Sequence, residues 1–365
     1  MLMFLAFLAL FISFAYAFVM LHFAAAWKNS AEEMTTDKQP GIFLSLVVAF
    51  KNEAEQLPQL LKSLSIQSYQ HFELLLVNDH SSDLFEPIIQ KHRQDIPFFH
   101  LITANGYGKK NALQEGIAKA KGKLIVCTDA DCVPGKDWLY ALAQFQEKTT
   151  ADLIIAPVKL THNTRLFSKI QALEFLSLAA ATGGAAMAKM PLMCNGANLA
   201  FTPQIWAKSN QNLRTDIASG DDMFLLMQVK KQAGKIAYLK SQQAIVQTKP
   251  SENLKAFFNQ RKRWVSKSKA YTDWQVIAVA LLVLLVCVNI PMYLLAGFFN
   301  PFFWKVTLLL FAVKFFADIA LLLSAAKFFK EEKVIILTPL LSLIYPFYVL
   351  TSAFGGIFGS FRWKN

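Results

Sequence analysis

The segment KLIVCTDAD, from Lys123 to Asp131, carries the pattern that decides the fold of this chain. It begins as an apolar run and ends at two aspartates, Asp129 and Asp131, that are separated by one alanine. A short apolar run bounded by polar residues is typical of a strand that is buried on both faces of a parallel sheet. The segment therefore predicts a strand that delivers two carboxylates to the edge of a sheet.

Three further apolar runs of this kind precede this segment, and stretches with helical spacing of apolar residues lie between them. Strands that alternate with helices predict an α/β fold with a mostly parallel, Rossmann-like sheet wrapped by helices. The expected strands are Ile42 to Phe50, Phe72 to Val77 and Phe98 to Thr103, with helices around Leu57 to Leu64 and Lys110 to Lys119.

Acidic residues follow three of the four expected strands. Glu53 comes after the first strand, Asp79 and Asp83 after the second, and Asp129 and Asp131 after the last. Ligands of parallel sheets bind outside the carboxyl ends of the strands, so we expect these acids to share one site. Each acid taken alone could also be a turn former or a helix cap. Three acidic strand ends together favour a ligand site.

The spacing of Asp129 and Asp131 predicts a metal site. Alternation in an extended segment points side chains at i and i+2 to the same side. Two hard oxygen ligands facing one spot suit Mg²⁺ or Mn²⁺, which would bridge to substrate phosphates and neutralise a departing diphosphate. We therefore expect a divalent cation and a phosphate-bearing substrate at this strand end.

Both ends of the chain are apolar enough to lie in lipid. The chain has 365 residues, of which 54% are hydrophobic, and its mean hydropathy is +0.33. Leu2 to Ala26 contains no charged residue and is long enough to cross a bilayer, and we interpret it as a retained anchor rather than a signal peptide. Three more spans bring the expected number to four: Val276 to Gly297, Phe302 to Ala326 and Val334 to Phe358.

These features predict four parts in chain order. Residues 1–27 form a transmembrane helix, 28–252 the α/β domain, 253–273 an interfacial helix, and 274–365 three transmembrane helices. The run from Leu166 to Met190 is also apolar, but charged residues and a Gly-Gly pair interrupt it. We expect a helix that is buried or lies at the membrane interface there, in preference to a fifth span.

Basic residues predict the orientation of the spans. Lys28, the segment from Lys262 to Lys269, and Lys327 to Lys333 would all be cytosolic if the N-terminus faces out, whereas Arg362 to Lys364 would then lie outside. The net charge of +12 is interpreted as a cytosolic face against anionic lipid headgroups, and not as a nucleic-acid site. The four cysteines show no paired spacing that predicts a disulfide framework or a zinc site.

Four motifs in order resemble those of the family-2 glycosyltransferases of the GT-A fold. A strand ends at Asp79, an Asp-x-Asp follows at Asp129 and Asp131, an acidic pair at Asp221-Asp222, and a Gln-x-x-Arg-Trp motif at Gln260 to Trp264. The resemblance covers roughly Leu44 to Ser268, and terminal helices are expected of the membrane-bound branch, which includes ceramide glucosyltransferases and the cellulose, chitin and hyaluronan synthases.

The resemblance implies a role for each matching residue. Asp79 would contact the nucleotide, and Asp131 with Asp129 would hold the donor diphosphate and its metal. Asp222, beside Asp221, would be the general base that deprotonates the acceptor hydroxyl, so that the product is inverted. Burial or the neighbouring anion would have to raise the pKa of that base.

The Gln-x-x-Arg-Trp motif lies in a stretch, from about Asn253 to Lys269, that is expected to be helical. Gln260, Arg263 and Trp264 would then share one face. Arg263 could grip the leaving diphosphate, and Gln260 and Trp264 could contact the acceptor or product. A basic amphipathic helix on the membrane surface, anchored by Trp264, is the alternative.

Two further stretches complete the expected site. Lys109, with Lys110 as the alternative, could reach a donor phosphate because Gly106 and Gly108 let the backbone approach closely, although a solvated charged turn is equally compatible. Asn195, in Cys194 to Asn198, resembles the family's segment beneath the sugar and acceptor, but Asn-Gly also marks an ordinary turn. Glu53 is assigned to the donor site on its position after the first strand.

Taken together, the residues and the resemblance predict an inverting transferase of a bacterial inner or plasma membrane with a cytosolic catalytic domain. It would move a hexose or N-acetylhexosamine from a nucleoside diphosphate, with UDP as the expected nucleotide, to a lipid or glycan acceptor. A processive polysaccharide synthase is the first alternative. A membrane scaffold or transporter with a degenerate transferase domain is the alternative from another class, although every acidic position that the chemistry needs is filled.

Overall fold

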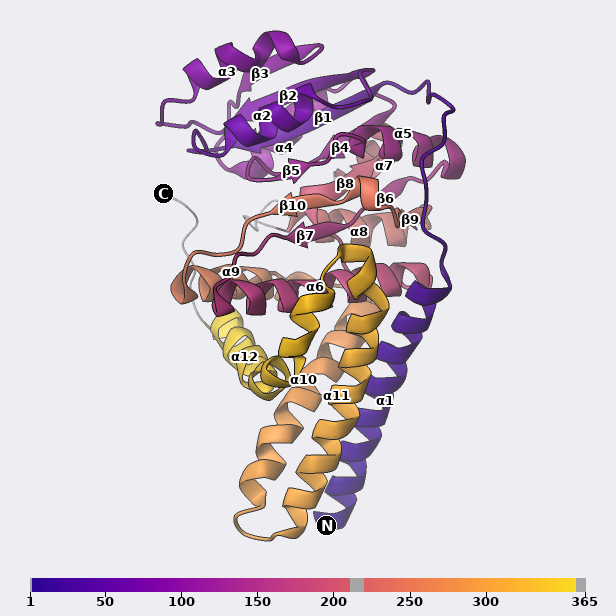
Figure 1. Ribbon diagram of the computed structural model, residues 1–365, viewed down its shortest axis with the longest axis vertical. Coiled ribbons are helices and arrows are strands. Elements are labelled where there is room, and N and C mark those ends of the chain that lie inside the picture. Colours follow the sequence, from indigo (N-terminus) through magenta and orange to yellow (C-terminus); the bar gives the residue numbers. More distant parts are fainter. Residues whose placement is uncertain (1, 211–219, 359–365) are drawn as a thin grey trace. The chain divides into compact units, whose positions relative to one another are not determined.

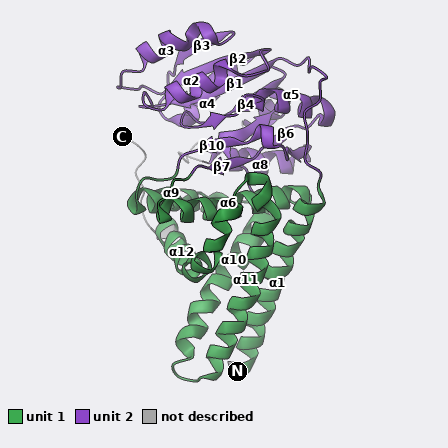
Figure 2. Cartoon of the chain, viewed as in Figure 1, with its two compact units in different colours: residues 1–30, 162–192, 250–365 green, residues 31–161, 193–249 purple. Residues whose placement is uncertain are grey.

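The structure is a computed structural model that describes residues 2–210 and 220–358. The chain divides into two compact units, coloured separately in Figure 2. Residues 31–161 and 193–249 form an α/β unit, and residues 1–30, 162–192 and 250–365 form a helical unit. Residues 162–192 therefore belong to the helical unit and not to the expected continuous domain 28–252, because a helix in that stretch packs against the terminal helices.

A seven-stranded sheet forms the core of the α/β unit, with strand order β3-β2-β1-β4-β8-β6-β9. β1 pairs in parallel with β2 and β4, whereas β8 pairs in antiparallel fashion with β4 and β6, so the sheet is mostly parallel as expected. The four predicted strands are present within two residues of their expected ends. The strands are β1 (Leu44–Phe50), β2 (Phe72–Asn78), β3 (Phe99–Thr103), β4 (Leu124–Cys127), β6 (Leu153–Ile155), β8 (Leu199–Phe201) and β9 (Ile236–Tyr238).

A second, three-stranded sheet consists of β5 (Val133–Pro134), β10 (Val246–Thr248) and β7 (Val158–Leu160). The fully buried Asn198 ties the elements around it together. Its amide nitrogen donates to the carbonyl oxygens of Pro157 and Ala244, both at 2.8 Å, and its amide oxygen accepts from the Trp138 indole at 2.9 Å. Because its donors and acceptor are satisfied, the amide can be buried without a large desolvation cost.

Helices cover the large sheet, and α4 approaches it most closely at a glycine. A Cβ at Gly116 would lie 2.6 Å from the Cγ1 of Val47 and 2.9 Å from the Cγ2 of Val77, so a side chain at this position would force α4 away from β1 and β2. The helices of this unit are α2 (Leu57–Ser65), α3 (Glu86–His92), α4 (Lys109–Lys119), α5 (Trp138–Thr149), α7 (Pro203–Ser209) and α8 (Asp221–Lys231). Short 3-10 turns span η1 (Arg93–Asp95), η2 (Gly196–Asn198) and η4 (Gln242–Ala244).

The helical unit contains three long helices that run side by side, α1 (Leu2–Asn29), α10 (Trp274–Ala296) and α11 (Phe302–Phe329) (Figure 1). Trp27 of α1 packs against Phe328 and Phe329 of α11, with ring centroids 5.2 and 5.8 Å apart. The remaining elements are α6 (Leu166–Met187), α9 (Leu254–Ser266), η5 (Lys267–Ala270), η6 (Glu332–Leu337) and α12 (Thr338–Phe358).

Five helical segments among the described residues are long and apolar enough to cross a membrane. Four correspond to the predicted spans, and the fifth is α6. α6 differs from the others because 61% of its most apolar window is buried, against 28–33% for the rest, and in Figure 1 it runs across the ends of the three long helices. A Cβ at Gly184 would lie 2.7 Å from the carbonyl oxygen of Phe23, so the two helices cross in close contact near the end of α1.

Two charged residues lie within α11, where an unpaired charge would be costly. Lys314 pairs with Asp318 one turn later, and the Tyr16 hydroxyl of α1 donates to the other oxygen of Asp318. The Lys314 ammonium also lies 4.5 Å from the centroid of the Tyr345 ring. These partners compensate both charges internally, which is how intramembrane ionisable groups are normally tolerated.

Candidate active site

The carboxyl ends of the parallel strands bring most of the predicted site residues together. Ligand atoms of Asp129, Asp131 and Cys132 all lie within 4.8 Å of one another. The two carboxylates are hard oxygen ligands of the kind that Mg²⁺ and Mn²⁺ prefer. Burial raises the pKa of the Cys132 thiol well above its usual range, and the thiol lies 3.7 Å from an Asp131 oxygen as a weak donor. The donor set therefore fits a hard divalent cation held by the two aspartates.

Lys109 lies directly beside this cluster. Its position follows from the structure of the preceding turn, in which Gly108 has a φ of 94° that a side chain would strain, and α4 begins at the next residue. The Lys109 ammonium pairs with Asp129. Burial alone would lower the pKa of this ammonium, but the carboxylates of Asp129, Asp131 and Asp222 raise it above its usual value. Lys109 therefore brings a positive charge to the place where a donor diphosphate would sit.

Asp79 connects the end of β2 to the turn before α4. It is 2% exposed, and one of its carboxylate oxygens accepts a hydrogen bond from the backbone nitrogen of Gly108 at 2.7 Å. The rings of His80 and Tyr107 stack nearby with their centroids 4.2 Å apart. The buried carboxylate thus holds the turn that presents Lys109.

The loop after β1 is tied to the loop after β2. The Ala54 nitrogen donates to Asp83 at 2.7 Å, and the Ser82 nitrogen donates to the Asn52 amide oxygen at 2.8 Å. Glu53 lies between these anchored positions, close enough to Asp131 for its negative charge to act on that carboxyl. The three acidic strand ends therefore converge on one edge, as predicted.

The acidic pair lies at the start of α8, after a Gly220 with a φ of 101°. Asp222 accepts hydrogen bonds from the backbone nitrogens of Gly196 at 3.1 Å and Met223 at 2.8 Å, which fix its orientation. Asp221 instead pairs with Lys110 at 3.2 Å. Burial raises the pKa of Asp221, although the Lys110 charge opposes it. Asp221 is thus a half-buried, lysine-paired acid directly beside the predicted base.

Asn195 acts locally as a cap. Its side-chain oxygen accepts from the Ala197 nitrogen at 3.0 Å and begins the 3-10 turn η2. The next nitrogen in the chain, that of Gly196, donates to Asp222. The turn interpretation of Asn-Gly therefore describes its backbone role, and the same turn supports the candidate base.

Gln260, Arg263 and Trp264 lie on α9, which belongs to the helical unit and not to the α/β unit. All three are half-buried. The Trp264 ring is covered by the guanidinium of Arg261, which lies 4.2 Å from its centroid, and Gln260 also contacts Arg261. Arg261, which was not predicted as a site residue, therefore contacts two of the three predicted residues, Gln260 and Trp264.

Sequence reasoning missed several long-range partners. Arg261 and Glu174 form a buried ion pair between α9 and α6, to which the Tyr348 hydroxyl of α12 donates at 2.8 Å. Lys110 was considered only as an alternative to Lys109, and its pairing with Asp221 spans more than a hundred residues of sequence. A buried arginine inside a basic helix has no local signature, because its partner lies on another helix.

The fold and the cluster define an α/β domain whose acidic residues gather at the carboxyl ends of parallel strands. More than half of the chain, residues 124–352, matches the glycosyl transferase family group 2, and residues 45–177 match glycosyl transferase family 2. The chain belongs to this family of glycosyltransferases. Its α/β unit has the GT-A fold.

Relatives of known identity match the chain in part. It is 26% identical over 151 residues to a poly-beta-1,6-N-acetyl-D-glucosamine synthase of Staphylococcus aureus. This match covers 41% of this chain and 36% of the synthase. The synthase of Staphylococcus epidermidis is 29% identical over 136 residues, 37% of this chain and 33% of the synthase. The chain thus matches about a third of the length of these curated relatives.

A solved structure matches over nearly the whole length. The mannosyltransferase PcManGT from Pyrobaculum calidifontis, in complex with GDP-Man and Mn²⁺, superposes with a TM-score of 0.60. The match covers 98% of this chain and 99% of that one at 16% identity, and it therefore supports the fold alone. The five apolar helices among the described residues indicate a membrane protein.

Proposed function

We propose that this chain transfers a sugar from a nucleoside-diphosphate-sugar to an acceptor held at the membrane, with inversion at the anomeric carbon. The observation that carries the proposal is the cluster of Asp129, Asp131, Lys109 and Asp222 at one edge of the sheet. It combines a cation site, a positive charge for phosphate and a fixed carboxylate, which are the groups that glycosyl transfer needs.

Each group has a defined role in this proposal. Asp222 accepts the proton of the acceptor hydroxyl, whose oxygen then bonds to the anomeric carbon as the bond to the diphosphate breaks. Lys109 moves from Asp129 towards the phosphates as the nucleotide leaves. Asp129 and Asp131 would hold Mg²⁺ or Mn²⁺, which when bound neutralises charge on the diphosphate. Asp79 and Glu53 complete the nucleotide side of the site.

The Gln-x-x-Arg-Trp helix supplies the remaining roles. Arg263 would bind the leaving diphosphate, and Gln260 and Trp264 would contact the acceptor or product, with Asn195 beneath the sugar. Arg261 holds the Trp264 ring and thereby fixes the face that it offers. The donor would be a UDP-hexose or UDP-N-acetylhexosamine delivered from the cytosol of a bacterial cell.

The acceptor decides between two products. Similarity to the poly-beta-1,6-N-acetyl-D-glucosamine synthases favours an N-acetylhexosamine donor and a polysaccharide product, so a processive synthase is the second candidate. Transfer of a single sugar or a short chain to a membrane-associated lipid or glycan acceptor is the first candidate.

A transfer assay tests the proposal. Membranes with the full chain are given UDP-glucose, UDP-GlcNAc, UDP-galactose or GDP-mannose with Mn²⁺ or Mg²⁺, beside the Asp222→Asn variant. We expect metal-dependent transfer from one donor, reduced about 10²- to 10⁴-fold in the variant because the proton acceptor is lost. Asp95→Asn, an exposed acid on another face, is the control and should retain activity.

The nature of the product separates the candidates. An organic-extractable product identifies a lipid acceptor, and a product of high mass identifies a processive synthase. Absence of transfer from every donor by folded protein, while nucleotide binding is unchanged in Asp131→Ala, would support a scaffold or transporter instead.

A further inference from the structure

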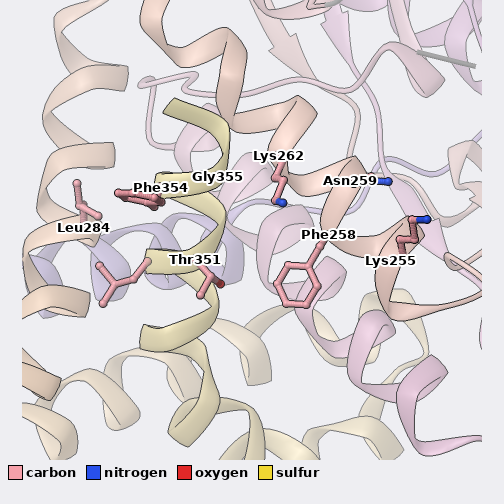
Figure 3. A pocket seen from close by; sticks show the side chains of 10 residues that line it. Lys255, Phe258, Asn259, Lys262, Leu284, Thr351, Phe354 and Gly355 are labelled. Atoms are coloured by element: carbon pink, nitrogen blue, oxygen red, sulfur yellow. The ribbon is translucent and has the colours of Figure 1, made fainter. Parts of the chain in front are cut away.

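A pocket of about 820 Å³ lies in the helical unit among α9, α10 and α12 (Figure 3). None of the residues that line it was assigned to the donor or to the acceptor. Its walls combine amine and amide groups of α9 with apolar side chains of the two neighbouring helices, and none of the ten described residues that line it is acidic. These residues are Lys255, Phe258, Asn259, Lys262, Leu284, Leu350, Thr351, Ala353, Phe354 and Gly355.

The polar wall is a single face of one helix. Lys255, Asn259 and Lys262 stand at i, i+4 and i+7 of α9, a spacing that places them on the same side over two turns. All three are hydrogen-bond donors, and two of them carry a positive charge. This face therefore selects an anion that accepts several hydrogen bonds.

Lys262 is held at the pocket by close packing between α9 and α12. A Cβ at Gly355 would lie 2.6 Å from the Cε and 3.1 Å from the Cδ of Lys262, so the lysine stem lies across the bare glycine backbone. A Cβ at Gly356 would similarly lie 2.6 Å from the Cβ of Val265. The two glycines bring the helices together and direct the ammonium to the pocket.

The apolar wall consists of residues from two candidate membrane spans. Leu284 belongs to α10, and Leu350 and Phe354 belong to α12. Phe354 is 69% exposed to the surroundings of the helices, which for a membrane span is lipid. An occupant of this pocket therefore has an anionic head and an apolar tail.

We propose that this pocket binds an anionic phospholipid of the surrounding bilayer. The phosphate lies against Lys255, Asn259 and Lys262, and the first part of an acyl chain lies on Leu284, Leu350 and Phe354. Basic pockets between membrane helices are a recurring way to bind such headgroups, and a pocket of several hundred Å³ suits a ligand of that size.

Lipid retention by the purified full chain tests the proposal. The delipidated protein in detergent is offered equal amounts of phosphatidylglycerol and phosphatidylcholine, and bound lipid is counted by native mass spectrometry. The wild-type chain should retain phosphatidylglycerol selectively. The double variant Lys255→Gln/Lys262→Gln should lose that lipid by roughly tenfold or more, since each lysine near a lipid headgroup contributes several-fold to binding.

Three further variants make the test specific. Lys255→Arg/Lys262→Arg keeps the charge and should retain the lipid, and Leu350→Phe narrows the apolar wall and should weaken retention without a change in charge. Lys327→Gln/Lys330→Gln removes the same charge from exposed positions outside the pocket and should retain the lipid.

Several results would overturn the proposal. They are equal retention of phosphatidylglycerol by Lys255→Gln/Lys262→Gln, equal loss in Lys327→Gln/Lys330→Gln, and equal retention of both lipids by the wild-type chain. Displacement of phosphatidylglycerol by a polyprenyl phosphate at equal concentration would show that the phosphate comes from a carrier lipid instead. The readout is lipid mass, so it does not depend on the transfer reaction.

Discussion

Asp129 and Asp131 offer oxygen, and Cys132 offers sulfur, to the same small volume. The choice among them follows from chemistry, because Mg²⁺ and Mn²⁺ bind carboxylate oxygen in preference to a buried thiol. Asp129 is paired with Lys109, and Asp131 is the more exposed of the two carboxylates. At the scale of single residues, the cation site should therefore depend on Asp131 and not on Cys132.

This distinction is testable with two neighbouring substitutions. In Asp131→Asn, Mn²⁺-dependent binding of UDP, measured by calorimetry on the full chain, should fall by about tenfold or more because a charged ligand is lost. Cys132→Ala should bind Mn²⁺ and UDP as the wild-type protein does. A loss in Cys132→Ala as large as that in Asp131→Asn would mean that sulfur is a ligand and that the ion is softer.

The residues at strand ends could be predicted because their signal is local. An apolar run followed by an acid is visible within ten residues, and the sheet brings such ends together whatever the details of packing. The partners of Lys109 and Lys110 were not predictable in this way. Whether a lysine meets Asp129, Asp221 or a phosphate depends on loop geometry that no spacing encodes.

Among the helices, α9 is held in place by a buried charged side chain. Arg261 is 4% exposed, and its guanidinium is bonded to Glu174 of α6 and lies over the rings of Phe257 and Trp264 at 4.4 and 4.2 Å. Tyr348 of α12 contacts the same pair. The helix that carries Gln-x-x-Arg-Trp is thus fixed to two other helices by one side chain.

Removal of that charge should destabilise the helical unit. Arg261→Met leaves Glu174 buried without its partner, which typically costs about 3–5 kcal/mol, so thermal unfolding in detergent should begin at a clearly lower temperature. The double variant Arg261→Met/Glu174→Gln should recover part of the loss, and the exposed Lys327→Met should have no effect. An unchanged unfolding temperature in Arg261→Met would show that α9 is held by apolar contacts alone.

The spacing of Gln260, Arg263 and Trp264 predicted α9 and long apolar runs predicted the terminal helices, but neither signal predicted how these helices contact one another. The α9 face was expected to present Gln260, Arg263 and Trp264, and the structure adds that Arg261 is the buried member of the motif. α6 was expected to be buried or interfacial on account of its charges. The structure gives the reason that Glu174 can lie there, namely its pairing with Arg261.

At the scale of the whole chain, sequence composition located the apolar ends but not the insertion of residues 162–192 into the helical unit. Chain order alone cannot show that α6 leaves the α/β unit and packs on α1 and α11. The same helices carry a marked asymmetry of charge. Lys28, Lys327, Lys330 and Lys333 lie at or just beyond the ends of α1 and α11, whereas Lys305 lies near the opposite end.

This asymmetry predicts the topology, because positive ends remain cytosolic. In a variant with Cys194→Ser, a cysteine at Phe299, in the exposed α10–α11 loop, should react with an impermeant maleimide in intact cells. A cysteine at Lys327 should react only after the cells are opened. The reverse pattern of labelling would place the positive end outside and would contradict a cytosolic donor site.

The configuration of the transferred sugar shows whether transfer inverts the anomeric carbon and whether it needs Asp222. The full chain is incubated with an α-linked UDP-sugar, Mn²⁺ and bacterial membrane acceptors, and the product linkage is determined by NMR beside that of Asp222→Asn. We expect a β-linked product that requires the metal and is nearly absent in the variant. An α-linked product, or equal product from Asp222→Asn, would contradict an inverting transfer with Asp222 as its base.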